Sequence, residues 1–379
     1  MKIVIDTIPL LSPLTGVGIY TYQIAKVLRE IAPSHEYTYF YGYYSSELKG
    51  SEENRRSFYR LRELARHFPY VENWGRSLKD FWNSFSSRSF DLYLEPHFFP
   101  LEIRARHIVA TVHDFSIFRF PQWQPKDKVR FFQKNFWPRI KKADRIITGS
   151  DYIREEAIGE FGFPPGQVIR IYYGVDHGVF KEYPSPQLQA VRDRYRLPET
   201  FILSVGAIEP RKNLDGLLRA YRLLDEGIRR DYKLVLAGFA GWENKEIMEK
   251  IQEQKGDVFY IGYLPKEDLA RIYNLATLFV YPSFYEGFGL PPLEAMACGC
   301  PVLVSKVSSL PEVCGNAAYY VDPKDIQEIA EGIYSLLTDP PLRESLSSLG
   351  AQQSGRFSWQ KSAGEHLKVF EEISAAASG

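Results

Sequence analysis

The chain has 379 residues, of which 45% are hydrophobic and 25% are charged, and its 47 Lys and Arg balance its 47 Asp and Glu. The chain is longer than a domain with a single hydrophobic core usually is, so two domains are expected. The composition is that of a globular protein, and the net charge of zero argues against a nucleic-acid-binding protein. The charge is unevenly divided, because residues 1–180 hold 25 basic and 20 acidic residues whereas the remainder holds 22 and 27.

Cysteine content and the N-terminus indicate the compartment. Cys298, Cys300 and Cys314 form no metal-ligand pattern, and a small odd number of cysteines is typical of a reducing environment. The chain enters a predicted strand at once and has neither the apolar segment nor the cleavage site of a signal peptide. No stretch approaches 18 consecutive apolar residues, the length that spans a membrane. These features predict a cytoplasmic protein.

The first half of the chain opens with a predicted strand at residues 3–6, a loop at 7–17 that leads into Gly16-Val17-Gly18, and a helix through residue 31. This order is typical of a doubly wound α/β fold. A nicotinamide-binding fingerprint needs a third glycine and an acidic residue after the second strand, at 37–41, and both are missing. Gly16 and Gly18 either let the backbone approach a ligand or serve a structural turn.

Residues 55–88 combine eight basic residues and three acidic residues with many bulky aromatic side chains. Two interpretations are open. Basic segments with aromatic residues can lie on an anionic membrane surface. Alternatively, the aromatic residues form core and the arginines a solvated face.

A predicted strand at 107–112 ends in His113-Asp114. Open α/β sheets bind ligands at the carboxyl ends of their strands, and histidine can donate to a hydroxyl or act near neutral pH. Its pairing with Asp114 distinguishes His113 from an isolated core histidine. After a helix at 126–142 and a strand at 145–148, Ser150 is a good helix cap.

The second half repeats the alternation after a connection at 181–200. A strand at 201–206 leads to Arg211 and Lys212, two adjacent cations that can meet phosphate oxygens or be solvated loop charges. Asn213 is the expected cap of the helix that follows. Further strands are predicted at 233–237 and 258–261.

The most informative stretch follows a predicted strand at 277–281. Two glycines and a helix that begins near Pro291 and Pro292 together make an anion site, because free amides and the positive helix end point the same way. Glu286 and Glu294 flank this site with seven residues between them. The alternative is an ordinary connection in which the helix dipole favours Glu294.

Together these segments carry a family resemblance. They are Gly16-Val17-Gly18, Val112-His113-Asp114, Gly149-Ser150, Gly174-Val175-Asp176, Glu209-Pro210-Arg211-Lys212-Asn213, the Glu286 and Glu294 pair, Ala297-Cys298-Gly299-Cys300-Pro301-Val302 and Leu310-Pro311-Glu312-Val313. On them the chain resembles the retaining family 4 glycosyltransferases of the GT-B fold. The match is dense over residues 200–323, patchy before them, and absent from 43–106.

The resemblance implies an α/β protein of the GT-B class, with two facing, Rossmann-like, doubly wound domains and an interdomain cleft. Residues 1–177 would form the acceptor-binding domain and residues 178–356 the domain that binds the nucleotide-sugar donor. The last helix, within 357–379, would pack back on the first domain.

The resemblance also implies roles for single residues. Arg211 and Lys212 would neutralise the donor diphosphate, and Glu286 would hold hydroxyls of the transferred sugar. His113 would donate toward that sugar. The remaining donor-binding positions are the amides of Phe288, Gly289 and Leu290, the carboxylate of Glu294 for the ribose, and Gly16 and Gly18 near the diphosphate and acceptor. Many relatives carry an arginine where this chain has Ala207, so neutralisation rests more on Arg211 and Lys212.

The implied reaction is transfer of a hexose from a nucleoside diphosphate sugar to a glycan or lipid-linked acceptor in bacterial polysaccharide or glycolipid synthesis. No metal and no other cofactor is expected, because cations and a helix N-terminus can stabilise the leaving diphosphate. The sequences of residues 209–213 and 287–292 resemble those of bacterial mannosyltransferases, and this favours GDP-mannose over a UDP-sugar as the donor. A nicotinamide-dependent oxidoreductase and a non-catalytic scaffold of the same shape are the alternatives from other classes.

Overall fold

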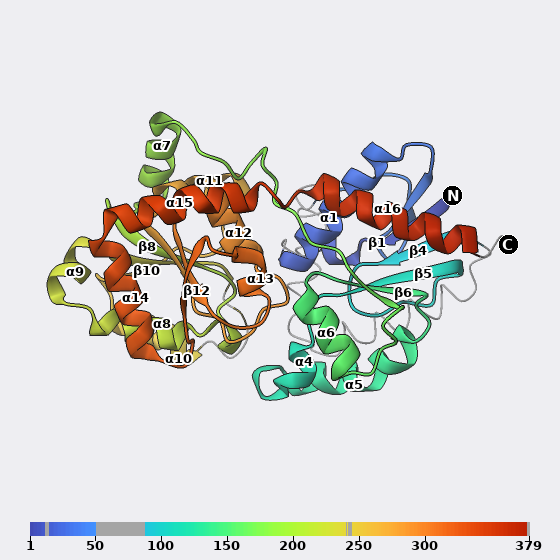
Figure 1. Ribbon diagram of the computed structural model, residues 1–379, viewed down its shortest axis with the longest axis horizontal. Coiled ribbons are helices and arrows are strands. Elements are labelled where there is room, and N and C mark those ends of the chain that lie inside the picture. Colours follow the sequence, from blue (N-terminus) through green and yellow to red (C-terminus); the bar gives the residue numbers. More distant parts are fainter. Residues whose placement is uncertain (12–14, 51–87, 240, 242–244, 377–379) are drawn as a thin grey trace. The chain divides into compact units, whose positions relative to one another are not determined.

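The computed structural model describes the chain except for residues 12–14, 51–87, 240, 242–244 and 377–379 (Figure 1). The described residues form two compact units. Unit 1 consists of Met1–Arg119, Lys126–Tyr173 and Trp359–Gly379, and unit 2 consists of Phe120–Pro125 and Gly174–Ser358. The sequence placed the division after residue 177.

Unit 1 is built on a seven-stranded sheet with the order β3-β2-β1-β4-β5-β6-β7. All neighbouring strands are parallel except β2 and β3. The strands are Lys2–Asp6 (β1), Glu36–Phe40 (β2), Tyr44–Ser45 (β3), Phe90–Glu95 (β4), Ala105–Val112 (β5), Arg145–Thr148 (β6) and Val168–Arg170 (β7). Ile3 pairs with Tyr37 on one side and with Leu92 on the other, and all three are buried. A central strand that is apolar on both faces requires cover on both faces.

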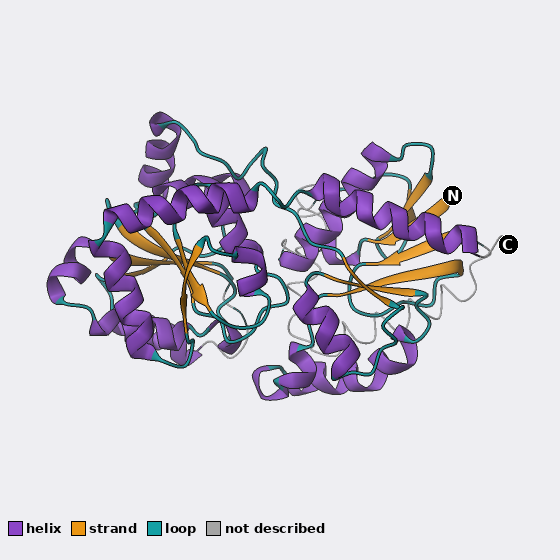
Figure 2. Ribbon diagram, viewed as in Figure 1, coloured by secondary structure: helices purple, strands orange, loops and turns teal. Residues whose placement is uncertain are grey.

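Helices supply that cover on both faces of the sheet (Figure 2). They are Gly16–Ile31 (α1), Ser116–Arg119 (α4), Lys126–Ile140 (α5), Asp151–Gly159 (α6) and Trp359–Ala376 (α16), with a short 3-10 turn at Ile8–Leu11. A second 3-10 turn, Pro121–Trp123, belongs to unit 2. Helix α16, from the C-terminal end of the chain, lies along α1 (Figure 1). The C-terminal helix therefore belongs to the same core as the first strand.

Unit 2 contains a six-stranded sheet, parallel throughout, with the order β10-β9-β8-β11-β12-β13. Its strands are Phe201–Val205 (β8), Lys233–Ala237 (β9), Val258–Tyr260 (β10), Leu278–Tyr281 (β11), Val302–Ser305 (β12) and Ala318–Val321 (β13). Its helices are Ser185–Tyr195 (α7), Leu214–Leu223 (α8), Glu226–Asp231 (α9), Lys245–Glu253 (α10), Lys266–Leu275 (α11), Leu290–Ala297 (α12), Leu310–Cys314 (α13), Ile326–Thr338 (α14) and Pro340–Ser354 (α15), with a 3-10 turn at Pro210–Lys212 (η3).

The strand order positions the functional loops of unit 2. From β8 the chain moves outward through β9 and β10, and it then returns to the other side of β8 with β11. Open α/β sheets bind ligands at such a switch point, outside the carboxyl ends of the two strands. The loops that follow β8 and β11 are those that carry Arg211, Lys212 and Glu286. In unit 1 the equivalent point lies between β1 and β4, next to β5.

The predicted fold class of two Rossmann-like, doubly wound domains is confirmed. Ser150 caps α6 as predicted, because its side chain accepts a hydrogen bond from the amide of Ile153. Two local predictions are wrong. Helix α1 begins at Gly16, so Gly16 and Gly18 lie in its first turn instead of in the preceding loop. Asn213 occupies the cap position of α8 in a left-handed conformation, but its side chain makes no cap bond.

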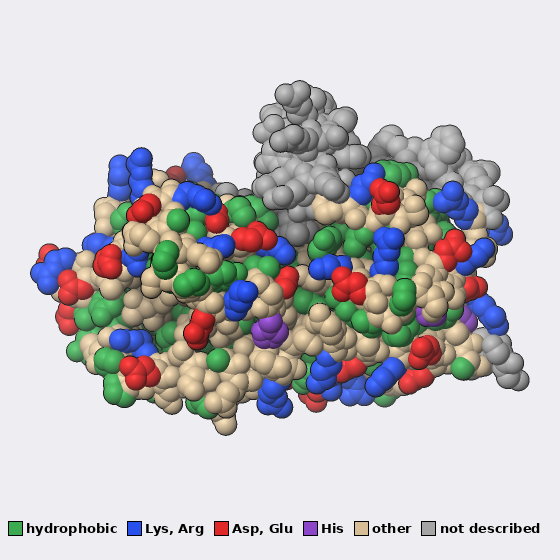
Figure 3. Space-filling model, turned by 90° about the horizontal axis from the view of Figure 1, so that it is seen from above, with side chains coloured by type: hydrophobic (Ala, Val, Ile, Leu, Met, Phe, Trp, Pro, Cys, Tyr) green, Lys and Arg blue, Asp and Glu red, His purple; other side chains and the backbone are tan. Residues whose placement is uncertain are grey.

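Two further features bear on the environment of the protein. Cys298, Cys300 and Cys314 are buried free thiols, and burial raises the pKa of each. None of the described helices combines the length and the apolar character that crossing a bilayer requires. Acidic and basic side chains are interspersed over the described part of the face shown in Figure 3, in keeping with the net charge of zero.

Candidate active site

The centre of the candidate site in unit 2 is a cluster of two cations and two carboxylates at the switch point. Lys212 donates from Nζ to Oε1 of Glu286 at 2.6 Å, and Arg211 donates from Nη1 to Oε2 of the same carboxylate at 2.8 Å. Arg211 also donates from Nη2 to Oε1 of Glu209 at 2.7 Å. One carboxylate thus bridges the two adjacent cations, and a second carboxylate holds the arginine from the other side.

Burial makes this cluster sensitive to its own charge balance. Glu286 is 6% exposed and Glu209 is 7% exposed, so neither carboxylate can rely on water for solvation. Burial alone would raise the pKa of Glu286, but Arg211 and Lys212 outweigh it and hold that pKa at about 2. Burial and the neighbouring Arg211 lower the pKa of Lys212, while Glu286 and Glu209 oppose the shift. Glu286 is therefore ionised at any physiological pH.

Short backbone segments determine the positions of the Arg211 and Lys212 side chains. The 3-10 turn η3 places Arg211 and Lys212 together, and the left-handed Asn213 then redirects the chain into α8. The Asn213 amide group donates to the carbonyls of Pro282 and Pro323, at 3.1 and 2.7 Å. Asn213 therefore ties the cation loop to the loop of Glu286, which explains an asparagine at this position better than the cap predicted from the sequence.

The loop of Glu286 is fixed by the segment that follows β12. The amide of Glu286 donates to Oγ of Ser308 at 2.9 Å. The hydroxyl of Ser309 lies 2.9 Å from the carbonyls of both Glu286 and Phe288. Ser308 adopts a positive φ of 50°, a conformation that few residues other than glycine tolerate. The segment after β12 therefore helps to set the position of the bridging carboxylate.

Helix α12 begins where this loop ends. Gly289, with φ of 108°, is its N-cap residue, and Pro291 and Pro292 occupy its first turn. These prolines carry no N–H group, so the amides that can meet an anion at this helix end belong to the residues before Pro291. Phe288, Gly289 and Leu290, which the sequence selected, are those residues.

Glu294 lies in the second turn of α12 and does not join the ion cluster. It is 5% exposed, and its described partner is the hydroxyl of Tyr273, 3.4 Å from Oε2. Burial raises the pKa of Glu294 to about 8, since Tyr273 offsets it only weakly and Asp176 adds to it. The two glutamates that the sequence grouped therefore differ in charge at pH 7, because Glu286 is an anion and Glu294 is mainly a neutral acid.

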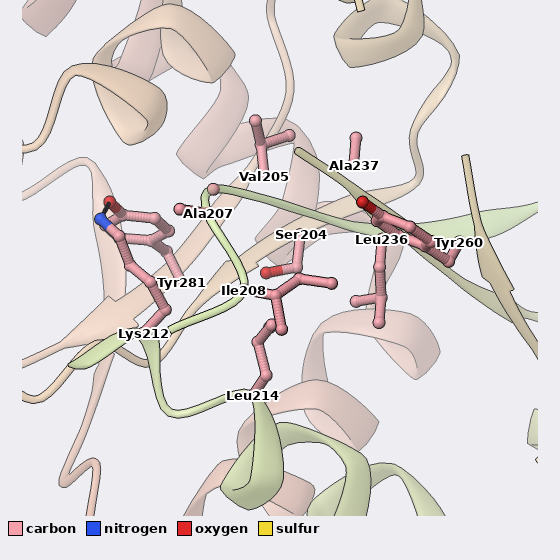
Figure 4. A pocket seen from close by; sticks show the side chains of 11 residues that line it. Ser204, Val205, Ala207, Ile208, Lys212, Leu214, Leu236, Ala237, Tyr260 and Tyr281 are labelled. Atoms are coloured by element: carbon pink, nitrogen blue, oxygen red, sulfur yellow. Dashed lines mark hydrogen bonds between the residues drawn. The ribbon is translucent and has the colours of Figure 1, made fainter. Parts of the chain in front are cut away.

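A small hollow adjoins the cluster at the ends of β8, β9 and β11 (Figure 4). Lys212 and Tyr281 form one wall, with the lysine ammonium hydrogen-bonded to the tyrosine hydroxyl. The aliphatic part of Lys212 passes Gly206, where a Cβ would lie in ordinary van der Waals contact with it, 3.5 Å away. A Cβ at Gly238 would lie 1.8 Å from the carbonyl oxygen of Gly206, so the adjacent strand ends approach this closely only with glycine.

The candidate residue of unit 1, His113, follows β5 and is 8% exposed. Its Nε2 lies 2.7 Å from the carbonyl of Pro96, and its Nδ1 lies 2.6 Å from the hydroxyl of Tyr173. The predicted pairing with Asp114 is wrong, because Asp114 accepts from the amide of Ser116. Burial lowers the pKa of His113 to about 4, with Pro96 and Asp114 only partly opposing the shift. His113 is thus a neutral imidazole near pH 7.

Several residues that complete these sites were not found in the sequence. Tyr281, Glu209, Ser308 and Ser309 hold the unit 2 cluster, and Tyr173 holds His113. Glu209 lies beside the basic pair, so its part in the cluster could have been predicted; the serines and tyrosines carry no sequence signal, because their neighbours are distant along the chain. The basic segment 55–88 lies outside the described residues except for Arg88.

Comparison with known proteins now identifies the family. The model for "Glycosyl transferases group 1" matches residues 191–353, and that for "Glycosyltransferase Family 4" matches residues 14–179. The O-antigen chain mannosyltransferase B of Escherichia coli is 35% identical over 381 aligned residues, which cover 98% of this chain and all of the relative. The chain belongs to the family 4 glycosyltransferases.

Solved structures agree with this family at the level of the fold. Sucrose-phosphate synthase from Thermosynechococcus elongatus superposes with a TM-score of 0.71 at 20% identity, covering 99% of this chain and all of that one. The lipopolysaccharide glycosyltransferase WaaG gives a TM-score of 0.68 at 14% identity, over 98% of this chain and 99% of the other. The GT-B fold predicted from the sequence is therefore confirmed. The family membership, and not the fold, excludes the nicotinamide-dependent alternative.

The first prediction concerns the bridging carboxylate. Glu286→Gln leaves Arg211 and Lys212 with Glu209 as their one remaining carboxylate partner within the described cluster, so we expect the free energy of unfolding to fall by about 3 kcal/mol. A nucleoside diphosphate supplies negative charge, and it should raise the melting temperature of this variant more than that of the wild type. Thermal unfolding with and without GDP and UDP measures both effects.

Glu253→Gln, at the exposed end of α10, is the matched control and should behave as the wild type. A Glu286→Gln variant that is as stable as this control, and gains no more from either nucleotide, would contradict the ion-cluster description.

Proposed function

We propose that this chain is a retaining mannosyltransferase that transfers mannose from GDP-mannose to a glycan or lipid-linked acceptor in bacterial polysaccharide or glycolipid synthesis. The observation that carries the proposal is the buried cluster of Arg211, Lys212 and Glu286 at the switch point of unit 2. The donor sugar and the pathway are supported by the name of the relative that is 35% identical along nearly the whole chain. A UDP-sugar donor is the alternative within the family.

The charge balance of the cluster suggests how the donor binds. Glu286 forms ion pairs with both cations. A donor diphosphate offers competing oxygens, and Lys212 and Arg211 would turn at least part of their hydrogen bonding toward it. Glu286 would then have carboxylate oxygens available for the hydroxyls of the transferred sugar. The amides of Phe288, Gly289 and Leu290 would meet the diphosphate, with Gly16 and Gly18 of unit 1 near it and the acceptor.

The two cations that neutralise Glu286 favour a positioning role for this carboxylate in a retaining reaction. In a double displacement a carboxylate attacks the anomeric carbon. A carboxylate held by two cations, with a pKa of about 2, is a weak nucleophile. We therefore propose transfer on the face from which the diphosphate leaves: the anomeric carbon–phosphate oxygen bond breaks, the acceptor oxygen bonds to the same face, and its proton passes to the departing diphosphate. A glycosyl adduct trapped on Glu286 would overturn this mechanism.

Charge stabilisation of the leaving diphosphate is assigned to the protein. Lys212, Arg211 and the N-terminus of α12 would supply positive charge at fixed positions. We propose that no bound metal is needed for this step. His113, as a neutral imidazole, has a single N–H group, on the Nε2 atom that faces the Pro96 carbonyl, and would share that hydrogen bond between Pro96 and the sugar without acting as an acid. Loss of transfer in the presence of a chelator, with recovery on adding a divalent cation, would contradict the metal-free assignment.

The second prediction tests donor identity. Ligands that bind the folded state raise its melting temperature, so GDP-mannose should give the largest shift among GDP-mannose, GDP-glucose, UDP-glucose and ADP-glucose. Mannose transfer to a mannose-terminated oligosaccharide should follow from GDP-mannose alone. A larger shift and faster transfer with UDP-glucose would select the alternative donor. Neither binding nor slow hydrolysis of any donor would favour a non-catalytic scaffold.

The third prediction concerns Glu294, which we assign to the ribose hydroxyls. Its pKa of about 8 means that Glu294 is mainly protonated at pH 7. A carboxylate that accepts from two hydroxyls has a lowered pKa, so donor binding should release close to one proton, and affinity should rise with pH toward about 8. Calorimetry of GDP binding at pH 7, in buffers of different ionisation enthalpy, measures the release.

The Glu294→Gln variant should release correspondingly fewer protons and bind GDP more weakly, whereas Glu253→Gln should match the wild type. Equal proton release in Glu294→Gln and the wild type would contradict the assignment.

The fourth prediction concerns a peripheral location on an anionic membrane surface. Residues 101–150 hold 11 Lys and Arg and 4 Asp and Glu. On α5, Lys128, Arg130 and Lys134 are exposed while Val129 and Phe132 face the core. These exposed basic side chains, together with residues 55–88, would attract acidic lipid headgroups. The wild type should therefore sediment with phosphatidylglycerol vesicles at low salt and be released at high salt.

Replacing Lys128, Arg130 and Lys134 by Gln separates the two surfaces. Reduced sedimentation would assign the binding to α5, and unchanged sedimentation would assign it to residues 55–88. A wild type that stays in solution at low salt would remove the membrane surface from the proposal.

A further inference from the structure

A buried cluster of aromatic and polar side chains surrounds His113 in unit 1. Tyr20 of α1, at its centre, is fully buried, and its hydroxyl lies 2.8 Å from Oγ1 of Thr111 and 2.7 Å from Nε2 of His366. Thr111 is on β5, two residues before His113, and His366 is on α16. The cluster thus joins the first helix, a central strand and the C-terminal helix around the candidate catalytic imidazole.

The hydrogen-bond partners define the tautomer of His113. The carbonyl of Pro96 can only accept, so the proton of the neutral imidazole is on Nε2, 2.7 Å away. Nδ1 is then an acceptor, and it receives the hydroxyl proton of Tyr173 at 2.6 Å. With the opposite tautomer, the lone pair of Nε2 would face the carbonyl oxygen of Pro96, and that arrangement is unfavourable. Tyr173 and Pro96 therefore select the same protonation of the ring.

Packing holds Tyr173 in the position that this hydrogen bond requires. Its ring lies 4.8 Å from the ring of Tyr20 and is stacked on Trp359, the first residue of α16, with centroids 6.3 Å apart and planes at 16°. Gly149 leaves room for the tyrosine, because a Cβ there would lie 2.6 Å from its ring. Tyr20 also meets His113 edge-on at 5.1 Å. The imidazole is thus enclosed by side chains whose own positions are fixed.

A second series of hydrogen bonds with defined directions reaches α16 through Thr111, Tyr20 and His366. Nδ1 of His366 lies 2.7 Å from the carbonyl of Ser362, which can only accept, so Nδ1 carries the proton and Nε2 accepts from Tyr20. The hydroxyl of Tyr20 can then accept from Thr111. Each polar side-chain atom in this series of hydrogen bonds has a defined donor or acceptor role, as a rigid buried network requires.

We propose that Tyr173 is a positioning residue for the transfer reaction, and that α16 secures it through Trp359 while His366 fixes Tyr20 beside it. The inference rests on the role proposed for His113. Tyr173 acts on the imidazole and not on the substrate: it keeps Nδ1 as an acceptor, so Nε2 remains the atom that carries the donated proton. Without the tyrosine hydroxyl, Pro96 still keeps the proton on Nε2, but Nδ1 loses its donor, so the ring is held at one nitrogen alone and His113 no longer presents its N–H in a fixed orientation.

Tyr173→Phe tests the inference, because phenylalanine keeps the ring over Gly149 and removes the hydroxyl alone. Loss of a side chain that orients a functional histidine typically lowers activity 10- to 100-fold, so we expect kcat to fall by about that factor. GDP affinity should be unchanged, because the assigned nucleotide contacts lie mainly in unit 2. Tyr172→Phe makes the same chemical change one residue away, where the ring lies under Arg170, and should leave kcat near the wild-type value.

A second readout does not depend on activity. Imidazole nitrogen NMR of the 15N-labelled protein, with signals assigned by their loss in His113→Gln, should show the Nε2–H tautomer of His113 in the wild type and in Tyr172→Phe. In Tyr173→Phe the Nε2 signal should stay that of a protonated nitrogen, whereas the Nδ1 signal should move downfield, because Nδ1 loses its hydrogen-bond donor. An unchanged His113 spectrum, or a wild-type kcat in Tyr173→Phe, would overturn the inference. If the wild type transfers no sugar the proposed function fails, and the nitrogen spectra still decide whether Tyr173 holds Nδ1.

Discussion

Neutralisation of buried charge at one loop junction is the constraint on which the donor-binding unit depends. Arg211 and Lys212 are adjacent along the chain, so their repulsion must be offset where they lie. Glu209 offsets it from one side and Glu286 from the other. Because Glu286 comes from a different loop, its bond to both cations holds the ends of β8 and β11 together. The ion cluster is thus at once a structural clamp and the place where an anionic ligand would be exchanged for a carboxylate.

Other features of unit 2 hold the loops of this ion cluster in place. Gly238, at the end of β9, lets the chain approach the carbonyl of Gly206 at a distance that any Cβ would forbid. Asn213 ties the cation loop to the loop of Glu286, and Ser309 ties that loop to the segment after β12. These contacts fix the cluster before a ligand arrives, so donors and cations need little reorganisation during the reaction. The parallel sheet supplies the rigid frame, since its strands are apolar on both faces.

Much of the fold was predictable from the sequence, because apolar strands alternate regularly with amphipathic helices. The strand at Arg145–Thr148 and the cap at Ser150 were found by local pattern alone. The local errors share one cause. Asn213 is a good cap by residue type, but its amide finds better partners in Pro282 and Pro323, which are distant in sequence. His113 is likewise bonded to Tyr173 and Pro96 instead of its neighbour Asp114.

The candidate site was only partly visible for the same reason. The sequence identified Arg211, Lys212 and Glu286 but assigned the cations and the carboxylate to separate parts of the donor, because it cannot show that they bind one another. It gave Glu286 and Glu294 different parts of the donor to bind but did not indicate that they differ in charge. Their surroundings separate them, since two cations keep Glu286 ionised while an apolar setting keeps Glu294 mainly protonated. Such differences depend on three-dimensional neighbours and leave no pattern in the chain.

The most direct test of this account is calorimetric comparison of GDP and GMP binding to the wild type and to Lys212→Met. The ion cluster should recognise the diphosphate, so the wild type should bind GDP at least about ten-fold more tightly than GMP, as expected for a charge-assisted hydrogen bond. Lys212→Met should lose most of that preference while binding GMP almost as the wild type does. An equal preference for GDP in both proteins would contradict the assignment of the cluster to the donor diphosphate.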